Sequence, residues 1–150
     1  PGNETRAASY LKRALADADI PSQLYALEPN RANLVARIKG SGGKRPLLIM
    51  GHTDVVGAQR ERWKVEPFAA IRNAGYIYGR GTIDDKDTVT AALFTMLLLK
   101  RQRVPLARDV IVFAFQMGSL ILPAVVPAVA WVLTHRRFLI GLRSREAAIP

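Results

Sequence analysis

Two short apolar runs that flank an amphipathic segment constrain the fold more than any other feature of the sequence. Residues 46–51 read PLLIMG and residues 110–115 read VIVFAF, and both lengths suit strands buried in a sheet. Between them, residues 86–100 place Val89 and Leu93 at helical spacing. A strand, a helix and a strand in this order predict an α/β fold with a mixed, partly parallel sheet, in which residues 46–51 form a central strand.

Weaker signals complete the predicted order of elements. Periodicity and turn residues predict a helix over 4–18, strands within 22–29 and 32–40, and a hairpin over 69–79 that turns at 73–75. The chain has 150 residues, which is the length of one domain. It has no cysteine, which excludes disulfides and thiolate metal sites.

The net charge of +10 raises the question of an anionic partner. The basic residues are scattered and are not interleaved with aromatic residues, so no nucleic acid is expected as a partner. A basic nucleic-acid-binding module is kept as an alternative, and it would show a steeply salt-dependent affinity. No signal-peptide pattern opens the sequence, which makes the cytoplasm the default expectation for its location.

Residues 111–133 contain no Asp, Glu, Lys, Arg or His, and arginines flank them on both sides. This length meets the criterion for a membrane span, and a membrane-associated protein anchored by residues 111–133 is therefore a second alternative. Pro123 and Pro127 interrupt any helix through this stretch, and its first residues belong to the predicted strand. We expect the residues beyond Gln116 to form a poorly packed, irregular segment.

A histidine and an aspartate follow the first apolar run. GHTDVV occupies residues 51–56, directly after the predicted strand, where α/β folds place their sites. His52 can ligate a metal through one ring nitrogen, and Asp54 can hold the other nitrogen and fix its tautomer. The alternative is a capped turn in which Asp54 binds local backbone amides, and an isolated H-x-D motif favours that alternative.

Two adjacent carboxylates open the long predicted helix. They lie in GRGTIDDK, residues 79–86, where two glycines permit a tight turn before Asp84 and Asp85. An aspartate at a helix N-terminus is ordinarily a cap, which requires no metal. A carboxylate after a Gly-rich turn can instead bridge two metal ions.

Taken in order, GHTDVV, a loop with the pattern W-x-x-x-P-F, YIYGRG and TIDDK before an Ala/Leu-rich helix resemble one family. This is the zinc aminoacylase, carboxypeptidase G and succinyl-diaminopimelate desuccinylase family of peptidases. The resemblance is densest between Leu47 and Leu99. It implies that residues 1–110 are the N-terminal portion of a zinc-peptidase catalytic domain, and that residues 111–150 form a divergent tail.

The resemblance implies a role for each matching residue. His52 matches a histidine ligand of one zinc, Asp54 the catalytic aspartate that orients this histidine, and Asp84 the carboxylate that bridges two zinc ions. Asp85 follows Asp84 across a peptide bond that is cis in the family. The implied activity is hydrolysis of an amide bond in a small peptide or an N-acyl amino acid, in which the zinc pair polarises the carbonyl and activates a water.

The resemblance stops near Val110. The family has a Glu-Glu pair shortly after the strand that residues 108–115 resemble, which supplies the general base and a zinc ligand, and a further acidic residue and a histidine follow. Downstream of Asp87 this chain has only Asp109, which we expect to be solvated, Glu146 and His135 as candidates. The chain as written is therefore expected to bind zinc weakly and to be inactive or nearly so, and a change of reading frame near the predicted strand would produce such a tail.

Overall fold

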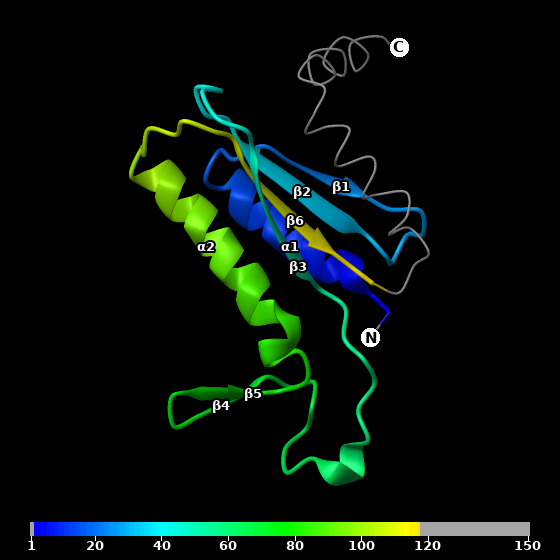
Figure 1. Cartoon of the computed structure of the whole chain (residues 1–150). Helices are drawn as coiled ribbons and strands as arrows, with labels where there is room; N and C mark the ends of the chain where they lie inside the picture. The colour runs from blue at the N-terminus through cyan, green and yellow to red at the C-terminus, as the bar shows by residue number, and fades with distance from the viewer. Residues whose placement is uncertain (1, 118–150) are drawn as a thin grey trace. The chain divides into compact units, whose positions relative to one another are not determined.

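The computed structural model describes residues 2–117. These residues form a four-stranded sheet, two α-helices and a separate two-stranded hairpin (Figure 1). In chain order the elements are α1 (Glu4–Ala16), β1 (Ser22–Tyr25), β2 (Asn33–Ile38), β3 (Leu47–His52), the short helix η1 (Arg60–Arg62), β4 (Ile71–Asn73), β5 (Tyr76–Tyr78), the irregular turn η2 (Thr82–Lys86), α2 (Asp87–Arg101) and β6 (Val110–Phe115).

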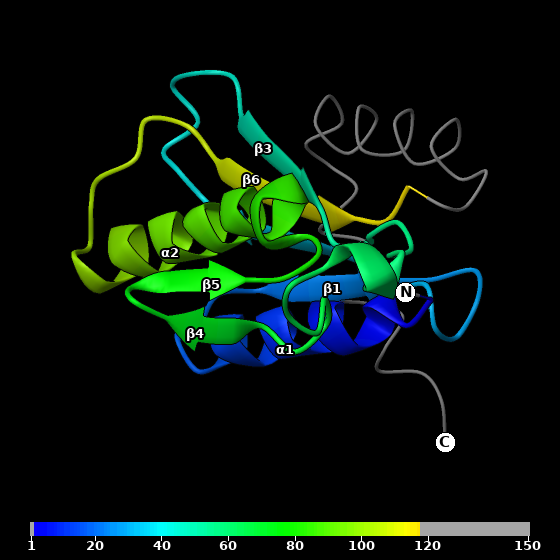
Figure 2. The same ribbon diagram turned by 90° about the horizontal axis from the view of Figure 1, so that it is seen from below.

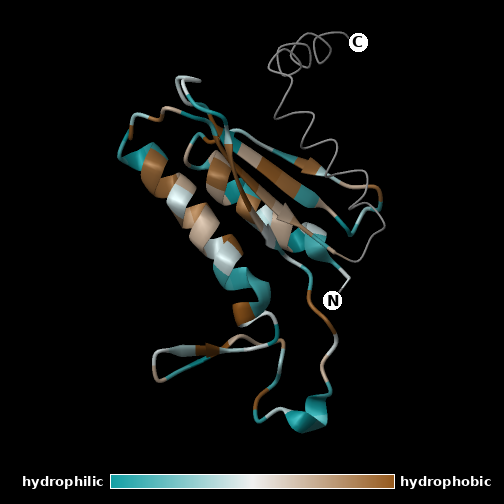
Figure 3. Cartoon of the chain, viewed as in Figure 1, coloured by the Kyte–Doolittle hydropathy of each residue, from teal (hydrophilic) through white to brown (hydrophobic). Residues whose placement is uncertain are grey.

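The sheet has the order β1-β2-β6-β3 and mixes both kinds of pairing. β2 pairs antiparallel with β1 and with β6, whereas β3 and β6 run parallel and are joined through α2. The predicted α/β fold with a partly parallel sheet is therefore confirmed. In Figure 3 the apolar residues run along β2 and β6, while η1 is hydrophilic.

One position in the predicted sheet is wrong. Residues 46–51 were expected to form a central strand, but β6 is central and β3 lies at the edge of the sheet that residues 2–117 form. Leu47 is 45% exposed and Met50 is 43% exposed, whereas the first five residues of β6 are all buried. An apolar run indicates that a strand contacts the core, but it does not indicate whether the strand pairs with other strands on both sides.

Both helices pack on the same face of this sheet. Leu34 and Ala36 of β2 stand opposite Ala114 and Val112 of β6, and these four residues belong to one buried cluster. The same cluster takes residues from both helices: Ala8, Leu11 and Leu15 from α1, and Val89, Ala92, Leu93 and Met96 from α2. Figure 2 shows α1 and α2 against the strands, with the β4–β5 hairpin beside them.

The predicted hairpin is confirmed, and its turn explains its sequence. β4 and β5 pair antiparallel, with Asn73 opposite Tyr76. The two residues between them, Ala74 and Gly75, have φ angles of 48° and 83°. Two central residues with positive φ are the requirement of the tight turn that matches the twist of a hairpin, and glycine meets this requirement without strain.

Asp109 is buried, which corrects the prediction that it is solvated. Its carboxylate accepts hydrogen bonds from the Nε atom of Arg37 at 2.9 Å and from the backbone N–H of Gly40 at 2.8 Å. A second nitrogen of Arg37 also contacts the same carboxylate. Asp109 therefore ties the start of β6 to the end of β2, two segments that are adjacent in space but far apart in the sequence.

Within residues 2–117, no helix is both long and apolar enough to cross a membrane. The apolar stretch 111–133 is described only as far as Met117, and its first residues belong to β6. The rest of that stretch, the predicted irregular segment, and the candidates His135 and Glu146 lie outside the described residues.

Candidate metal centre

The motifs GHTDVV and TIDDK meet at the end of the sheet where β3 and β6 finish. β3 ends at His52, which stands opposite Phe115 at the end of the parallel strand β6. Thr53, the next residue, donates two hydrogen bonds to the carbonyl oxygen of Phe115, from its N–H at 2.6 Å and from its Oγ1 at 3.1 Å. The turn η2 contacts β3 at the same end of the sheet, and residues 84–86 contact His52 and Thr53.

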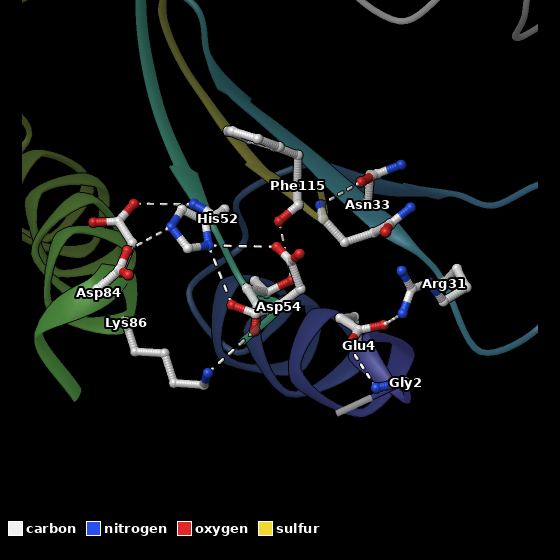
Figure 4. A network of polar contacts seen from close by, with 12 residues as sticks. Gly2, Glu4, Arg31, Asn33, His52, Asp54, Asp84, Lys86 and Phe115 are labelled. Atoms are coloured by element: carbon white, nitrogen blue, oxygen red, sulfur yellow. Dashed lines mark hydrogen bonds and ion pairs between the residues drawn. The ribbon is translucent and has the colours of Figure 1, made fainter. Parts of the chain in front are cut away.

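His52 and Asp84 are in direct contact, as Figure 4 shows. Nε2 of His52 lies 2.9 Å from Oδ1 of Asp84. The prediction that these side chains lie close together at the same end of the sheet is therefore confirmed. The His52 side chain is 16% exposed and that of Asp84 is 83% exposed, which leaves Asp84 accessible to a further group.

Asp54 lies on the other side of the same ring. Nδ1 of His52 is 3.1 Å from the backbone oxygen of Asp54 and 3.3 Å from its Oδ1. That Oδ1 atom is buried, and no hydrogen-bond partner is found for it among the described residues. The aspartate therefore does not cap backbone amides through this oxygen. Two acceptors beside Nδ1 favour a proton on that nitrogen, which directs the lone pair of the neutral ring to Nε2.

The electrostatics of the pair fit a site for a cation. Burial by itself lowers the pKa of His52, but the hydrogen bond with Asp84 and the contacts with Asp54 outweigh it, so the pKa of His52 is raised. In the protonated ring, Nε2–H donates to Oδ1 of Asp84 and Nδ1–H donates to the backbone oxygen of Asp54. A metal ion competes with a proton for such donors, because its ligands must be deprotonated.

Asp85 faces a different way from Asp84. The peptide bond between these residues is cis, as the resemblance implied. Oδ2 of Asp85 accepts a hydrogen bond from the backbone N–H of His52 at 3.0 Å, so this side chain contacts the backbone of β3. Gly51 precedes His52 in β3, and a Cβ atom at Gly51 would lie 2.8 Å from Cγ2 of Val89 and 3.0 Å from Oδ2 of Asp85. The glycine thus makes the close approach of the two motifs possible.

Lys86 is the contact residue that the sequence analysis missed. Its Nζ atom donates a hydrogen bond to the backbone oxygen of Thr53 at 3.1 Å. The available signal was its place directly after two aspartates, which suggests a charge that balances them. The sequence offers no sign that a lysine at this position would reach a backbone carbonyl of the first motif.

The donors have the right chemistry for zinc but are too few. Imidazole nitrogen and carboxylate oxygen are both common zinc ligands, and protein zinc sites use three or four of them. Among residues 2–117, no group of three or more His, Cys, Asp or Glu side chains could hold a metal ion. The part of the chain that the structure describes therefore offers the pair His52 and Asp84.

Comparisons with known proteins point to one family. Residues 48–118 match the family model described as "Peptidase family M20/M25/M40". A probable succinyl-diaminopimelate desuccinylase of Staphylococcus aureus is 39% identical over 101 residues, which cover 67% of this chain and 25% of the relative. The human N-fatty-acyl-amino acid synthase/hydrolase PM20D1 is 50% identical over 62 residues, which cover 41% of this chain and 12% of the relative.

A solved structure agrees with the sequence matches. The M20 family metallo-carboxypeptidase Sso-CP2 of Sulfolobus solfataricus superimposes with a TM-score of 0.63 at 28% identity, covering 74% of this chain and 25% of its own. The chain thus spans about a quarter of the length of the first curated relatives that it matches. The residues that match the family model, 48–118, include both motifs and β6.

Proposed function

Because this chain belongs to the peptidase family M20/M25/M40, we propose that it supplies the His52–Asp84 portion of a metal-dependent amide hydrolase site. The observation that carries the proposal is the 2.9 Å contact between Nε2 of His52 and Oδ1 of Asp84 at the edge of the sheet. An imidazole beside an exposed carboxylate, with a half-buried aspartate against its other ring nitrogen, is an arrangement that fits a pair of metal ligands.

Each of the three residues has a distinct role in this proposal. His52 is a ligand through Nε2, Asp84 is a ligand whose exposed carboxylate can serve two metal ions, and Asp54 holds Nδ1–H and fixes the ring. Asp54 thereby raises the basicity of His52 toward the metal. Zinc is the metal we propose. When bound, a zinc pair polarises the substrate carbonyl and lowers the pKa of a bound water.

The proposed substrate is a small peptide or an N-acyl amino acid. The names of the relatives support this class, since one is a probable desuccinylase, one an N-fatty-acyl-amino acid synthase/hydrolase and one a metallo-carboxypeptidase. The common chemical element is an amide bond near a free carboxylate.

We propose that residues 1–110 correspond to part of a catalytic domain and that residues 111–150 diverge from it. The general base and the remaining ligands of a complete site are not among residues 2–117. General-base catalysis contributes typically ~10² to 10⁴-fold to a rate. The chain of this sequence is therefore expected to hydrolyse amides at or near the background rate.

Zinc titration of the full chain tests the proposal. The chain has two histidines, His52 and His135, so the imidazole resonances of each can be followed separately by NMR. We expect weak zinc binding that shifts the His52 signals, that is lost in His52→Ala and that persists in the matched control His135→Ala. Binding that is unaffected by His52→Ala would contradict the proposal. Tight binding of two zinc ions would contradict the view that this chain holds an incomplete set of ligands.

A further inference from the structure

We infer that Lys86 is a positioning residue of this site, which holds the segment 52–54 in place through the backbone oxygen of Thr53. The segment carries both the imidazole of His52 and the carboxylate of Asp54. The inference deepens the proposed function and rests on it only for what the positioned imidazole does. The positioning itself follows from contacts that exist without a metal.

Asp84, Asp85 and Lys86 are consecutive in the sequence, and each contacts a group of His52 or Thr53, as Figure 4 shows in part. Asp84 contacts the ring of His52 at 2.9 Å, and Asp85 accepts from the N–H of His52 at 3.0 Å. Lys86 then donates to the oxygen of Thr53 at 3.1 Å. The side chains of residues 84–86 therefore hold the ring and the backbone of the segment at three adjacent points.

The contact of Lys86 determines the position of Asp54 because of where Thr53 lies. The N–H and Oγ1 of Thr53 are already bonded to Phe115, which fixes one side of this residue to β6. Its carbonyl belongs to the peptide plane that leads into Asp54, and Lys86 holds that carbonyl. Residues 53–59 form neither helix nor strand, so no ladder of backbone hydrogen bonds fixes this plane in place of Lys86.

The fold makes space for the lysine at this point. Gly81, with a φ angle of 79°, has no side chain, and a Cβ atom there would lie 3.0 Å from Nζ of Lys86 and 2.2 Å from Cγ1 of Val55. The backbone N–H of Lys86 also donates to the oxygen of Gly81 at 3.1 Å.

The chain offers a matched control in α2, the helix that Lys86 immediately precedes. Lys100 also donates from Nζ to a backbone oxygen, that of Asp19 at 2.9 Å. It lies at the other end of α2, and its contact joins this helix to the residues after α1. Lys86→Met and Lys100→Met therefore each remove one ammonium and one bond to a carbonyl, but only the first removal affects the segment 52–54.

The test measures the tautomer of His52 and its response to zinc chloride in the full chain. In the parent, long-range ¹H–¹⁵N spectra at a pH where the ring is neutral should show a population of Nδ1–H, which the contacts with Asp54 favour. In Lys86→Met we expect a mixture with more Nε2–H, and a zinc affinity of His52 that is about tenfold lower, as is typical when the partner of a ligand is disturbed. Lys100→Met should match the parent in both measurements, and Lys86→Arg, which keeps a charged donor, should restore most of the Nδ1–H signal.

The outcomes separate this inference from the proposed function. If Lys86→Met keeps both the tautomer and the zinc response of the parent, the inference is overturned and the proposed function stands. If zinc never shifts His52 but Lys86→Met still changes its tautomer, the proposed function fails and the positioning role stands. Lys86→Gln, which is shorter and uncharged, replaces Lys86→Met should that variant not fold, and a parent-like tautomer in Lys86→Gln would equally overturn the inference.

Discussion

Asp109→Asn tests the buried carboxylate that joins β2 to β6. The substitution keeps the shape of the side chain and removes its charge. In the parent the carboxylate receives Arg37 on one oxygen and the N–H of Gly40 on the other. An asparagine can accept from only one of these donors, because its amide nitrogen would face the other donor.

The expected loss follows from the contacts that disappear. A hydrogen bond to a charged group contributes a net ~1.5 to 3 kcal/mol, and breaking a fully buried ion pair costs more. The side chain of Arg37 is 23% exposed and that of Asp109 is 12% exposed, so solvent compensates in part for the lost contact. We therefore expect Asp109→Asn to lower the free energy of unfolding by about 2 kcal/mol, which is about a thirtyfold change in the unfolding equilibrium.

The assay is urea unfolding of the full chain between pH 3 and pH 7. Burial by itself raises the pKa of Asp109, but the N–H of Gly40 and the guanidinium of Arg37 outweigh it, and the pKa is lowered. A carboxyl with a depressed pKa stabilises the fold above its unfolded-state pKa of about 3.9, and this stabilisation disappears as the pH falls through the folded-state value. The difference between parent and variant should thus be constant from about pH 5 to 7 and shrink below about pH 4.

Two results would refute this reasoning. The first is an unfolding midpoint for Asp109→Asn at pH 7 that equals that of the parent. The second is a difference that persists unchanged at pH 3, since a purely steric effect does not titrate. Glu61→Gln is the matched control, because Glu61 is exposed and its neutralisation should change the free energy of unfolding by less than about 0.5 kcal/mol.

Three further substitutions test the close approach at Gly51, the backbone conformation of Gly75 and the packing of Met96. Gly51→Ala should destabilise the chain and speed amide exchange at the end of β3, because the new Cβ would displace Val89 or Asp85; unchanged exchange there would contradict the close approach. Gly75→Ala meets open space at a φ of 83°, so we expect a loss of about 1 kcal/mol from backbone strain alone, with the amide resonances outside the hairpin unchanged. Met96→Ala removes a side chain with no exposed surface and should lower the free energy of unfolding by ~2 to 5 kcal/mol in urea titrations; a loss below about 1 kcal/mol would indicate that the cluster collapses around the cavity.

Much of the fold could be predicted because local patterns carry it. The apolar run of β6, the periodicity of α2 and the two-residue turn of the hairpin each specify one element without reference to the rest of the chain. The meeting of His52 and Asp84 was also predictable, since His52 ends β3 and Asp84 lies just before α2, the helix that connects β3 to the parallel strand β6, so both belong at the C-terminal end of β3.

The failures concern contacts between distant residues. Arg37 and Asp109 are 72 residues apart, and nothing near Asp109 in the sequence indicates a guanidinium partner, so a solvated carboxylate was the natural expectation. The edge position of β3 depends on which strands lie beside it, which its own composition does not record. The bond from Lys86 to the oxygen of Thr53 pairs a side chain with a backbone group, and every residue has such a group, so no residue type identifies it.

Residues 84–86 hold the segment 52–54 through three adjacent contacts, two at His52 and one at Thr53. These contacts also indicate which parts of the chain tolerate insertions. A one-residue insertion inside either triplet would displace the contacts that follow it, and the imidazole would lose its alignment. Residues 55–80, by contrast, connect the two triplets. The contacts that hold the triplets together do not depend on the length of this connection. Doubling the length of a flexible connection costs only about 0.6 kcal/mol in loop entropy. The connection 55–80, which contains η1 and the β4–β5 hairpin, is therefore the part in which proteins with the same two triplets can gain or lose residues.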